Sequence, residues 1–148
     1  MGPVSSQAAP NPKHDRSTMP SSLLLVTDID FWNIGLGSHA RVLALLRCLA
    51  GKVDLTAVYL GPAQPGPPGL MARLGLSGVT QHLYRPGEQP SQKENARRFA
   101  AFAAGKSFDA VIIEYIWLHY LLDALPAGPR TFLDTHDIMS ARSDSFEA

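Results

Sequence analysis

Five short apolar runs, separated by stretches with helical or loop patterning, constrain the fold of this chain most strongly. Runs of about four to eight apolar residues are typical of strands buried on both faces of a parallel sheet. The runs are Leu23–Asp28, Val53–Leu60, Val79–Tyr84, Asp109–Tyr115 and Arg130–Asp134. Because parallel neighbours in a sheet need a crossover between them, this pattern predicts strands that alternate with helices.

The stretches between the runs carry the spacing of amphipathic helices. From Ser38 to Ala50, apolar residues recur at intervals of three and four positions and so share one helical face. Ser91 and Glu94 form the S-x-x-E pattern of a capping box, which predicts the start of a second helix, and Gly105 ends it. Shorter helices are expected at Leu70–Leu74 and at Trp117–Leu125. The aromatic and leucine side chains of the last segment, Trp117 included, are expected in the core.

These elements predict an α/β fold, a Rossmann-like three-layer sandwich with a mainly parallel sheet of about five or more strands. The 148 residues are enough for one domain with its own core. We assign residues 23–148 to that domain. Residues 1–22 are rich in proline and small polar residues, and we expect them to form a disordered leader.

Composition and charge argue against several classes of protein. Lys and Arg together number 13, as do Asp and Glu, so bulk electrostatics does not favour a nucleic-acid partner. The single cysteine, Cys48, permits neither an internal disulfide nor a cysteine-rich zinc site. The sequence shows no secretory signal and no apolar run of the ~20 residues that cross a bilayer. We expect a cytoplasmic protein, and peripheral contact with the inner membrane face stays open.

In open parallel sheets, ligands bind beyond the carboxyl ends of the strands, where the strand order reverses. The loop after the first run is the first such position. Its glycines would let a backbone approach a phosphate, and the helix that follows offers N–H groups and the positive end of its dipole. One turn further on, Arg41 is placed to reach an anion. We predict substrate-binding roles for Asn33, Gly35, Gly37, Ser38 and Arg41.

The loops after the fourth and fifth runs supply the other candidates. Glu114 and Tyr115 end the fourth run and are expected to bind substrate in the same crevice. His136 follows the fifth run, where its ring can donate to a sugar hydroxyl or to a developing charge. Asp137 is the second catalytic candidate, and capping of a following helix is the alternative for it. Purely structural roles for these residues stay open.

Two other motifs are weaker matches. Gly35, Gly37 and Ala40 fit the G-x-G-x-x-A form of the dinucleotide fingerprint, but the loop before them is long and no acidic residue ends the second run. Asp28 and Asp30 match the D-x-D of haloacid dehalogenase-type phosphatases, although carboxylates that stabilise the loop would give the same pattern. A metal site is not expected, because the acidic and histidine residues after the fifth run lie too close together for a cage.

Taken together, the segments resemble the N-terminal half of a GT-B glycosyltransferase of glycosyltransferase family 4 (group 1). The resemblance spans about Leu23 to Phe146 and rests on LLLVTDIDFWNIGLGSHARVLALLRCLAGKVDLTAVYLG and FDAVIIEYIWLHYLLDALPAGPRTFLDTHDIMSARSDSF. The pair Glu114-Tyr115 and the stretch Asp134–Asp137 carry it best. Residues 62–106 match only in pattern.

The resemblance implies a retaining, metal-independent transfer of sugar from a nucleotide-sugar donor, with no cofactor. The N-terminal domain of such enzymes mostly holds the acceptor, here a glycan or a lipid-linked saccharide, and a C-terminal domain mostly holds the donor. Gly35 and Gly37 would approach the donor phosphates, and His136 would approach the donor sugar. From the resemblance we expect the C-terminal domain to be missing after Ala148, and we expect a truncated enzyme that is inactive alone. A non-catalytic α/β binding or regulatory module is the alternative.

Overall fold

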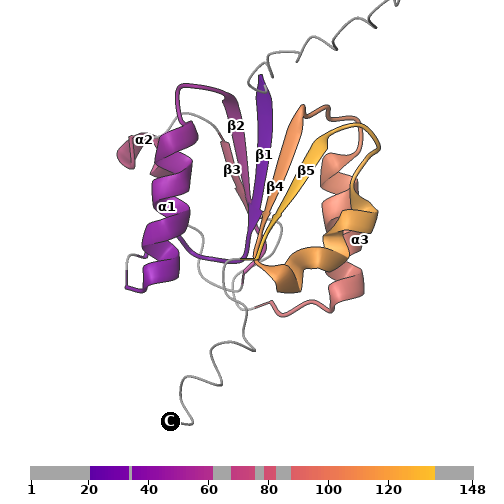
Figure 1. Cartoon of the computed structure of the whole chain (residues 1–148). Coiled ribbons are helices and arrows are strands. Elements are labelled where there is room, and N and C mark those ends of the chain that lie inside the picture. Colours follow the sequence, from indigo (N-terminus) through magenta and orange to yellow (C-terminus); the bar gives the residue numbers. More distant parts are fainter. Residues whose placement is uncertain (1–20, 34, 62–67, 76–78, 83–87, 136–148) are drawn as a thin grey trace, which may run out of the picture.

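A computed structural model describes residues 21–33, 35–61, 68–75, 79–82 and 88–135 of the chain. Strands and helices alternate along them, as the apolar runs predict (Figure 1). The elements are β1 (Ser22–Thr27), α1 (Gly37–Leu49), β2 (Asp54–Tyr59), α2 (Leu70–Arg73), β3 (Val79–His82), α3 (Gln92–Ala103), β4 (Ala110–Glu114), the 3₁₀ helix η1 (Ile116–Ala124) and β5 (Arg130–Asp134). Residues 1–20 of the expected leader and the segment after Thr135 lie outside the described residues. Ser21 and Ser22 are described, and β1 begins at Ser22, one residue before the expected start of the domain.

The strands form one parallel sheet in the order β3-β2-β1-β4-β5. The side chains of β1, β2, β4 and β5 are described, whereas β3 is described by its backbone alone. From the central strand β1, the chain first builds towards β3 and then returns to place β4 on the other side of β1. The strand order therefore reverses between β1 and β4. The expected α/β class with a parallel sheet is confirmed.

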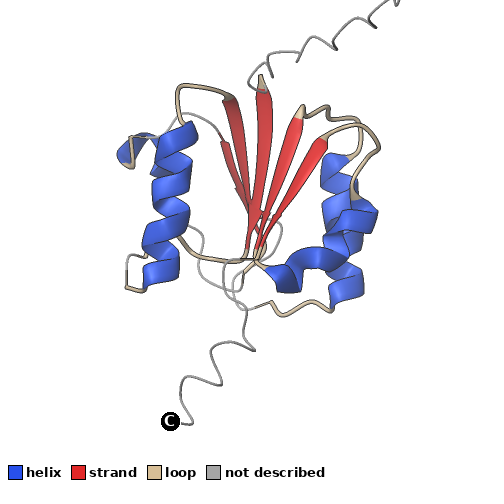
Figure 2. Cartoon of the chain, viewed as in Figure 1, coloured by secondary structure: helices blue, strands red, loops and turns tan. Residues whose placement is uncertain are grey.

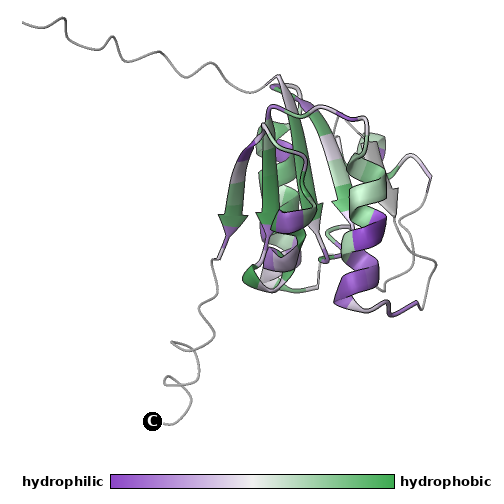
Figure 3. Ribbon diagram, turned by 90° about the vertical axis from the view of Figure 1, so that its right-hand side faces the viewer, coloured by the Kyte–Doolittle hydropathy of each residue, from purple (hydrophilic) through white to green (hydrophobic). Residues whose placement is uncertain are grey.

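Helices cover both faces of this sheet (Figure 2). α1 packs on one face in an apolar cluster that contains Leu23 and Leu25, and α3 and η1 pack on the other face with Leu24 and Val26. These four residues of β1 alternate between the faces, as the two-residue period of a strand requires. Figure 3 shows most of the strand residues as apolar, and β1 and β4 are buried on both faces. The edge strand β5 is not, because Arg130, Thr131 and Phe132 are exposed.

The two long helices begin in different ways. Ser91 caps α3, because its side chain accepts a hydrogen bond of 3.3 Å from the Glu94 backbone N–H, and this confirms the predicted cap. The Glu94 carboxylate does not complete the box, since it pairs with Arg97 at 2.7 Å and with Arg98 at 2.8 Å. The N-cap of α1 is Leu36, which makes no side-chain cap. The start of α1 therefore keeps its capacity to bind an acceptor group from outside the helix.

The last predicted helix differs from the expectation in type and in burial. It is a 3₁₀ helix, and its buried residues Leu118 and Leu121 are three positions apart, which matches three residues per turn. Trp117 is 39% exposed, so its predicted place in the core is wrong. The reason is the same period, because one apolar face of a 3₁₀ helix cannot bury every apolar residue of the segment. No helix in the described part of the chain is long and apolar enough to cross a membrane.

Candidate functional site

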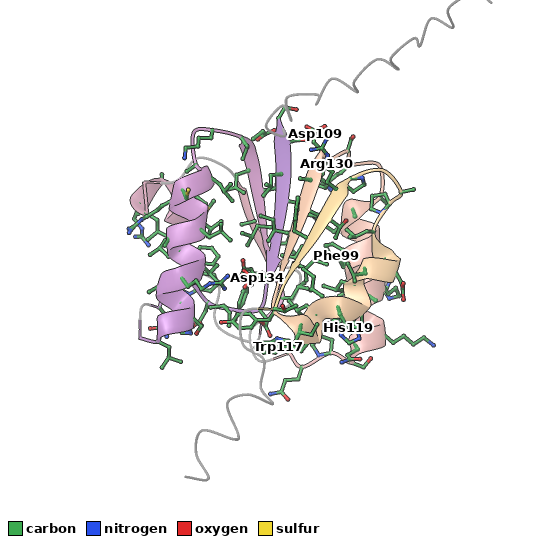
Figure 4. The ribbon with its side chains drawn as sticks, viewed as in Figure 1. Phe99, Asp109, Trp117, His119, Arg130 and Asp134 are labelled. Carbon is green, nitrogen blue, oxygen red and sulfur yellow. The ribbon has the colours of Figure 1, made fainter. Side chains whose placement is uncertain are left out.

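The carboxyl ends of β1 and β4 lie side by side where the strand order reverses. The register pairs Val26 with Ile113, so the next positions along both strands, from Thr27 and Glu114 onward, are also neighbours. The loops that hold the predicted site residues leave the sheet at this edge. Figure 4 shows Asp134 and Trp117 here, and Asp109 and Arg130 at the opposite, amino end of the strands. Parallel α/β sheets bind their ligands at such a reversal.

On the α1 side of this edge, one arginine faces two carboxylates. Arg41 Nη1 lies 3.4 Å from Glu114 Oε2, and Arg41 Nη2 pairs with the Asp134 carboxylate. Glu114 and Asp134 are partners in the β4–β5 register, so both side chains leave the sheet on the face that α1 covers. Two of the predicted residues, Arg41 and Glu114, are thus brought into contact. Asp134 joins them, although the sequence analysis gave it no role of its own.

Glu114 is the more unusual of the two acids. It is fully buried, and its Oε1 has no hydrogen-bond partner among the described residues. Burial raises the pKa of Glu114, and the negative charge of Asp134 raises it further, whereas Arg41 opposes both effects. The carboxyl therefore keeps its proton to a higher pH than an exposed glutamate does. Perturbed acids of this kind concentrate in functional sites.

On the η1 side, Asp28 and Trp117 form a second polar contact. Asp28 Oδ2 accepts a hydrogen bond of 2.7 Å from the Trp117 indole N–H. The other oxygen, Oδ1, is shielded from solvent and has no partner within the part of the chain that the structure describes. Burial raises the pKa of Asp28, while the bond from Trp117 lowers it. The sequence analysis considered Asp28 only as a phosphatase nucleophile or as a loop-stabilising acid.

Tyr115 connects the two sides and carries backbone strain. Its φ is +78° with ψ +139°, a region that residues other than glycine rarely adopt and that costs about 1–3 kcal/mol. Its ring stacks on Trp117, with centroids 4.2 Å apart and planes 15° from parallel. Its backbone N–H donates to the Asp134 carbonyl at 3.0 Å and so extends the β4–β5 pairing. Strain held in place at a switch point is typical of a functional position.

Packing does not explain the two glycines, Gly35 and Gly37, at the start of α1. A Cβ at Gly35 or Gly37 would meet no atom within 4 Å, and neither residue has a positive φ. The first turn of α1 contains no acidic residue, and Ser38, in that turn, is half-buried. The fold itself thus leaves room for a side chain at Gly35 and at Gly37. A ligand that approached the backbone closely would collide with such a side chain.

Contacts within the loop use the remaining polar groups. Asn33 Nδ2 donates to Asp30 at 3.3 Å, and His39 Nε2 pairs with Asp30 at 3.2 Å. The other ring nitrogen of His39 donates to the Asn33 carbonyl oxygen. Asp30 therefore stabilises the loop and has different partners from Asp28. Asn33 is exposed beside the glycines, in the place that its predicted substrate contact needs.

The predicted site and the observed one differ at several residues. His136 and Asp137 lie outside the described residues, so their catalytic roles stay predictions. Within the described ranges, no group of three or more His, Cys, Asp or Glu side chains is placed to hold a metal ion. The site residues that the sequence analysis missed are Asp28, Asp134 and Trp117. Asp28 and Asp134 had a local signal, since each ends an apolar run in the same way as Glu114, whereas Trp117 had none.

A cavity of about 700 Å³ lies at the opposite end of the strands, and its lining includes Phe108, Arg130 and Phe132. Beside it, the Asp109 carboxylate accepts bonds from the backbone N–H groups of Ser21 and Ser22 at 3.0 and 2.9 Å. Hydrogen bonds from Ser21 and Ser22 lower the pKa of Asp109 to about 2. This carboxylate joins the starts of β1 and β4 and does not face the switch point.

Comparisons with models of protein families, with curated proteins and with solved structures give no significant match for this chain.

Proposed function

We propose that this chain is the acceptor-side domain of a cytoplasmic glycosyltransferase, which transfers sugar from a nucleotide-sugar to a glycan or lipid-linked acceptor. The observation that carries the proposal is the meeting of two features at the switch point. One is the start of α1, which has no side-chain cap and is reached through unhindered glycines. The other is the cluster in which the buried Glu114 meets the partly exposed Arg41 and Asp134.

The first feature suits the phosphates of the donor. Amide N–H groups at a helix start and the positive end of the helix dipole favour an anion, and glycine permits close approach of the anion to the backbone. Arg41 stands about one turn behind them, where it pairs with Glu114 and Asp134. In the proposed reaction, the anomeric carbon exchanges its bond to the diphosphate for a bond to an acceptor oxygen. The acceptor proton is released, and the nucleoside diphosphate leaves.

The second feature suits an acceptor hydroxyl. Glu114 offers an unpartnered oxygen, and Arg41, which also pairs with Asp134, holds the other oxygen of the carboxyl. A buried group of fixed geometry can position a hydroxyl without the reorganisation that water requires. We assign His136 and Asp137 to the donor side of the same reaction, with retention and without a bound metal. The donor would lie mostly on a second domain.

The test compares Gly37→Ala with the unaltered protein. Because a Cβ at this position meets nothing within 4 Å, the fold should keep its stability, while the methyl group should obstruct a phosphate. The assay is release of nucleoside diphosphate from UDP-, GDP- and ADP-sugars by the longest polypeptide in which this chain occurs. We expect a loss of at least about tenfold in kcat/KM, which corresponds to about 1.4 kcal/mol.

Arg130→Gln, at the opposite end of the strands, is the matched control and should leave turnover unchanged. The 148-residue chain alone should show no transfer. The proposal fails if the longest polypeptide turns over none of the donors with a mixture of glycan and lipid-linked acceptors. It also fails if Gly37→Ala leaves kcat/KM at its original value.

A further inference from the structure

Trp117 presents an open aromatic surface at the switch point. Tyr115 covers one face of the indole, so the exposed 39% of Trp117 belongs to the opposite face and the ring edge. The bond from its N–H to Asp28 fixes the rotation of the ring. Tyr115 is almost fully buried below it, and the strained backbone there positions the pair. The result is a rigid platform rather than a mobile surface side chain.

Two acceptor atoms accompany this platform. Asp28 Oδ1 and Glu114 Oε1 are both shielded from solvent and have no partner among the residues that the structure describes. Residues of β4 alternate between the faces, so Glu114 leaves on the α1 side, while Asp28 contacts Trp117 on the η1 side. An unsatisfied buried acceptor costs about 1–3 kcal/mol, which a donor group from a ligand would recover. The two atoms thus lie on opposite faces of the sheet, at the neighbouring carboxyl ends of β1 and β4.

The combination favours a polyhydroxylated ring as the ligand. The C–H groups on one face of a sugar ring contact the electron-rich face of an indole, and several hydroxyl groups can donate to separate carboxylates. A quaternary ammonium group is less suited, because aromatic cages surround the cation with several ring faces and here a single face is open. A lipid chain offers no donors for the two oxygens.

We propose that Trp117 is the stacking platform for the acceptor of the transfer reaction, and that this acceptor is a saccharide whose hydroxyls donate to Asp28 and Glu114. The role of the saccharide as acceptor rests on the proposed function. The binding of a saccharide at this site does not, because it can be measured without turnover. The inference assigns roles to Trp117 and Asp28 and narrows the acceptor to its sugar portion, whether that sugar is free or attached to a carrier.

Fluorescence can report binding directly, because the chain has two tryptophans, Trp32 and Trp117. The variant Trp32→Phe keeps an aromatic ring beside Phe31 and Tyr59 and leaves Trp117 as the only indole. The probes are methyl glycosides of glucose, mannose, galactose and N-acetylglucosamine, titrated into the 148-residue chain. We expect a saturable change in emission with a Kd near the millimolar range for at least one glycoside, about −4 kcal/mol.

Three further variants, made in the Trp32→Phe background, sharpen the test. Asp28→Asn keeps an acceptor for the indole N–H but replaces the free oxygen by a donor, so it should weaken glycoside binding at least tenfold. Trp117→Ala removes the platform and should abolish binding, followed by NMR of the amide signals near Tyr115. Phe132→Ala, which removes a 56% exposed ring in the middle of β5 that lines the cavity at the amino end of the strands, is the control and should change nothing.

The outcomes separate this inference from the proposed function. Saturable glycoside binding that depends on Trp117 and Asp28 supports the saccharide site, even if no donor is ever turned over. The inference is overturned if no glycoside shifts the emission or if Asp28→Asn binds as well as the parent. Saturation by choline but by no glycoside overturns it as well. Turnover that Trp117→Ala leaves unchanged would refute the acceptor role while leaving the glycosyltransferase assignment intact.

Discussion

The Glu114 side chain lowers the stability of the fold and is also a candidate functional group. Its carboxyl is fully buried beside Asp134, and Arg41 is the cation in contact with it in the described structure. A fold selected for stability alone would gain by placing an apolar residue there. The acid is therefore best explained by what it does at the switch point, and its cost should be visible in the pH dependence of stability.

We predict that the Glu114 carboxyl destabilises the fold as the pH rises. Its native pKa is raised, so its favourable contribution is complete below the ordinary value of 4.5 and is lost as the pH rises through the native pKa. Each unit of pKa displacement corresponds to about 1.4 kcal/mol. Urea unfolding at a series of pH values should therefore show Glu114→Gln gaining stability, relative to the parent, from pH 4 upward.

Glu94→Gln is the matched control, and the difference should run in the opposite direction. Hydrogen bonds from Arg97 and Arg98 lower the pKa of Glu94 to about 2. The contribution of Glu94 is therefore present above pH 4.5 and is lost as the pH falls towards the native pKa. If both variants gave the same slope against pH, the raised pKa of Glu114 would be refuted.

At the scale of elements, α1 and α3 differ in how each helix begins. Ser91 satisfies an amide of α3 from within the chain, whereas Leu36 precedes α1 with extended φ and ψ and no capping group. Leu36 is also 66% exposed, so replacing its side chain should disturb no packing. A helix start without a side-chain cap is a loss in stability that an anionic ligand can compensate.

This contrast predicts that Leu36→Asp raises stability and lowers donor binding. The backbone of Leu36 already has the extended conformation of an N-cap, so a capping carboxylate should add about 0.5–2 kcal/mol to the free energy of unfolding. The same carboxylate would occupy the place proposed for the donor phosphates. Thermal unfolding and nucleotide-sugar turnover by the longest polypeptide measure the two effects. Leu36→Ser, which is neutral, should stabilise α1 with a smaller loss of turnover.

At the scale of the whole molecule, the strands could be predicted from the sequence, whereas most contacts of the candidate site could not. The apolar runs placed every strand to within a few residues, because burial on both faces leaves a local signal in β1 and β4. The site depends on contacts between distant positions, such as Arg41 with Glu114 and Asp28 with Trp117, which are 73 and 89 residues apart. Strand order decides those contacts, and no local pattern encodes the positive φ of Tyr115.

The central place of β1 predicts that the two faces of the sheet unfold together. Leu24 belongs to the cluster under α3 and Leu25 to the cluster under α1, and both are completely buried. Because adjacent residues of one strand serve both clusters, loss of either cluster should release the other. Leu46→Ala on α1 and Phe99→Ala on α3 each remove a fully buried side chain from one cluster and should cost about 2–5 kcal/mol. Circular dichroism and tyrosine and tryptophan fluorescence should then give one coincident transition in both variants, whereas separated transitions would show that each face is stable alone.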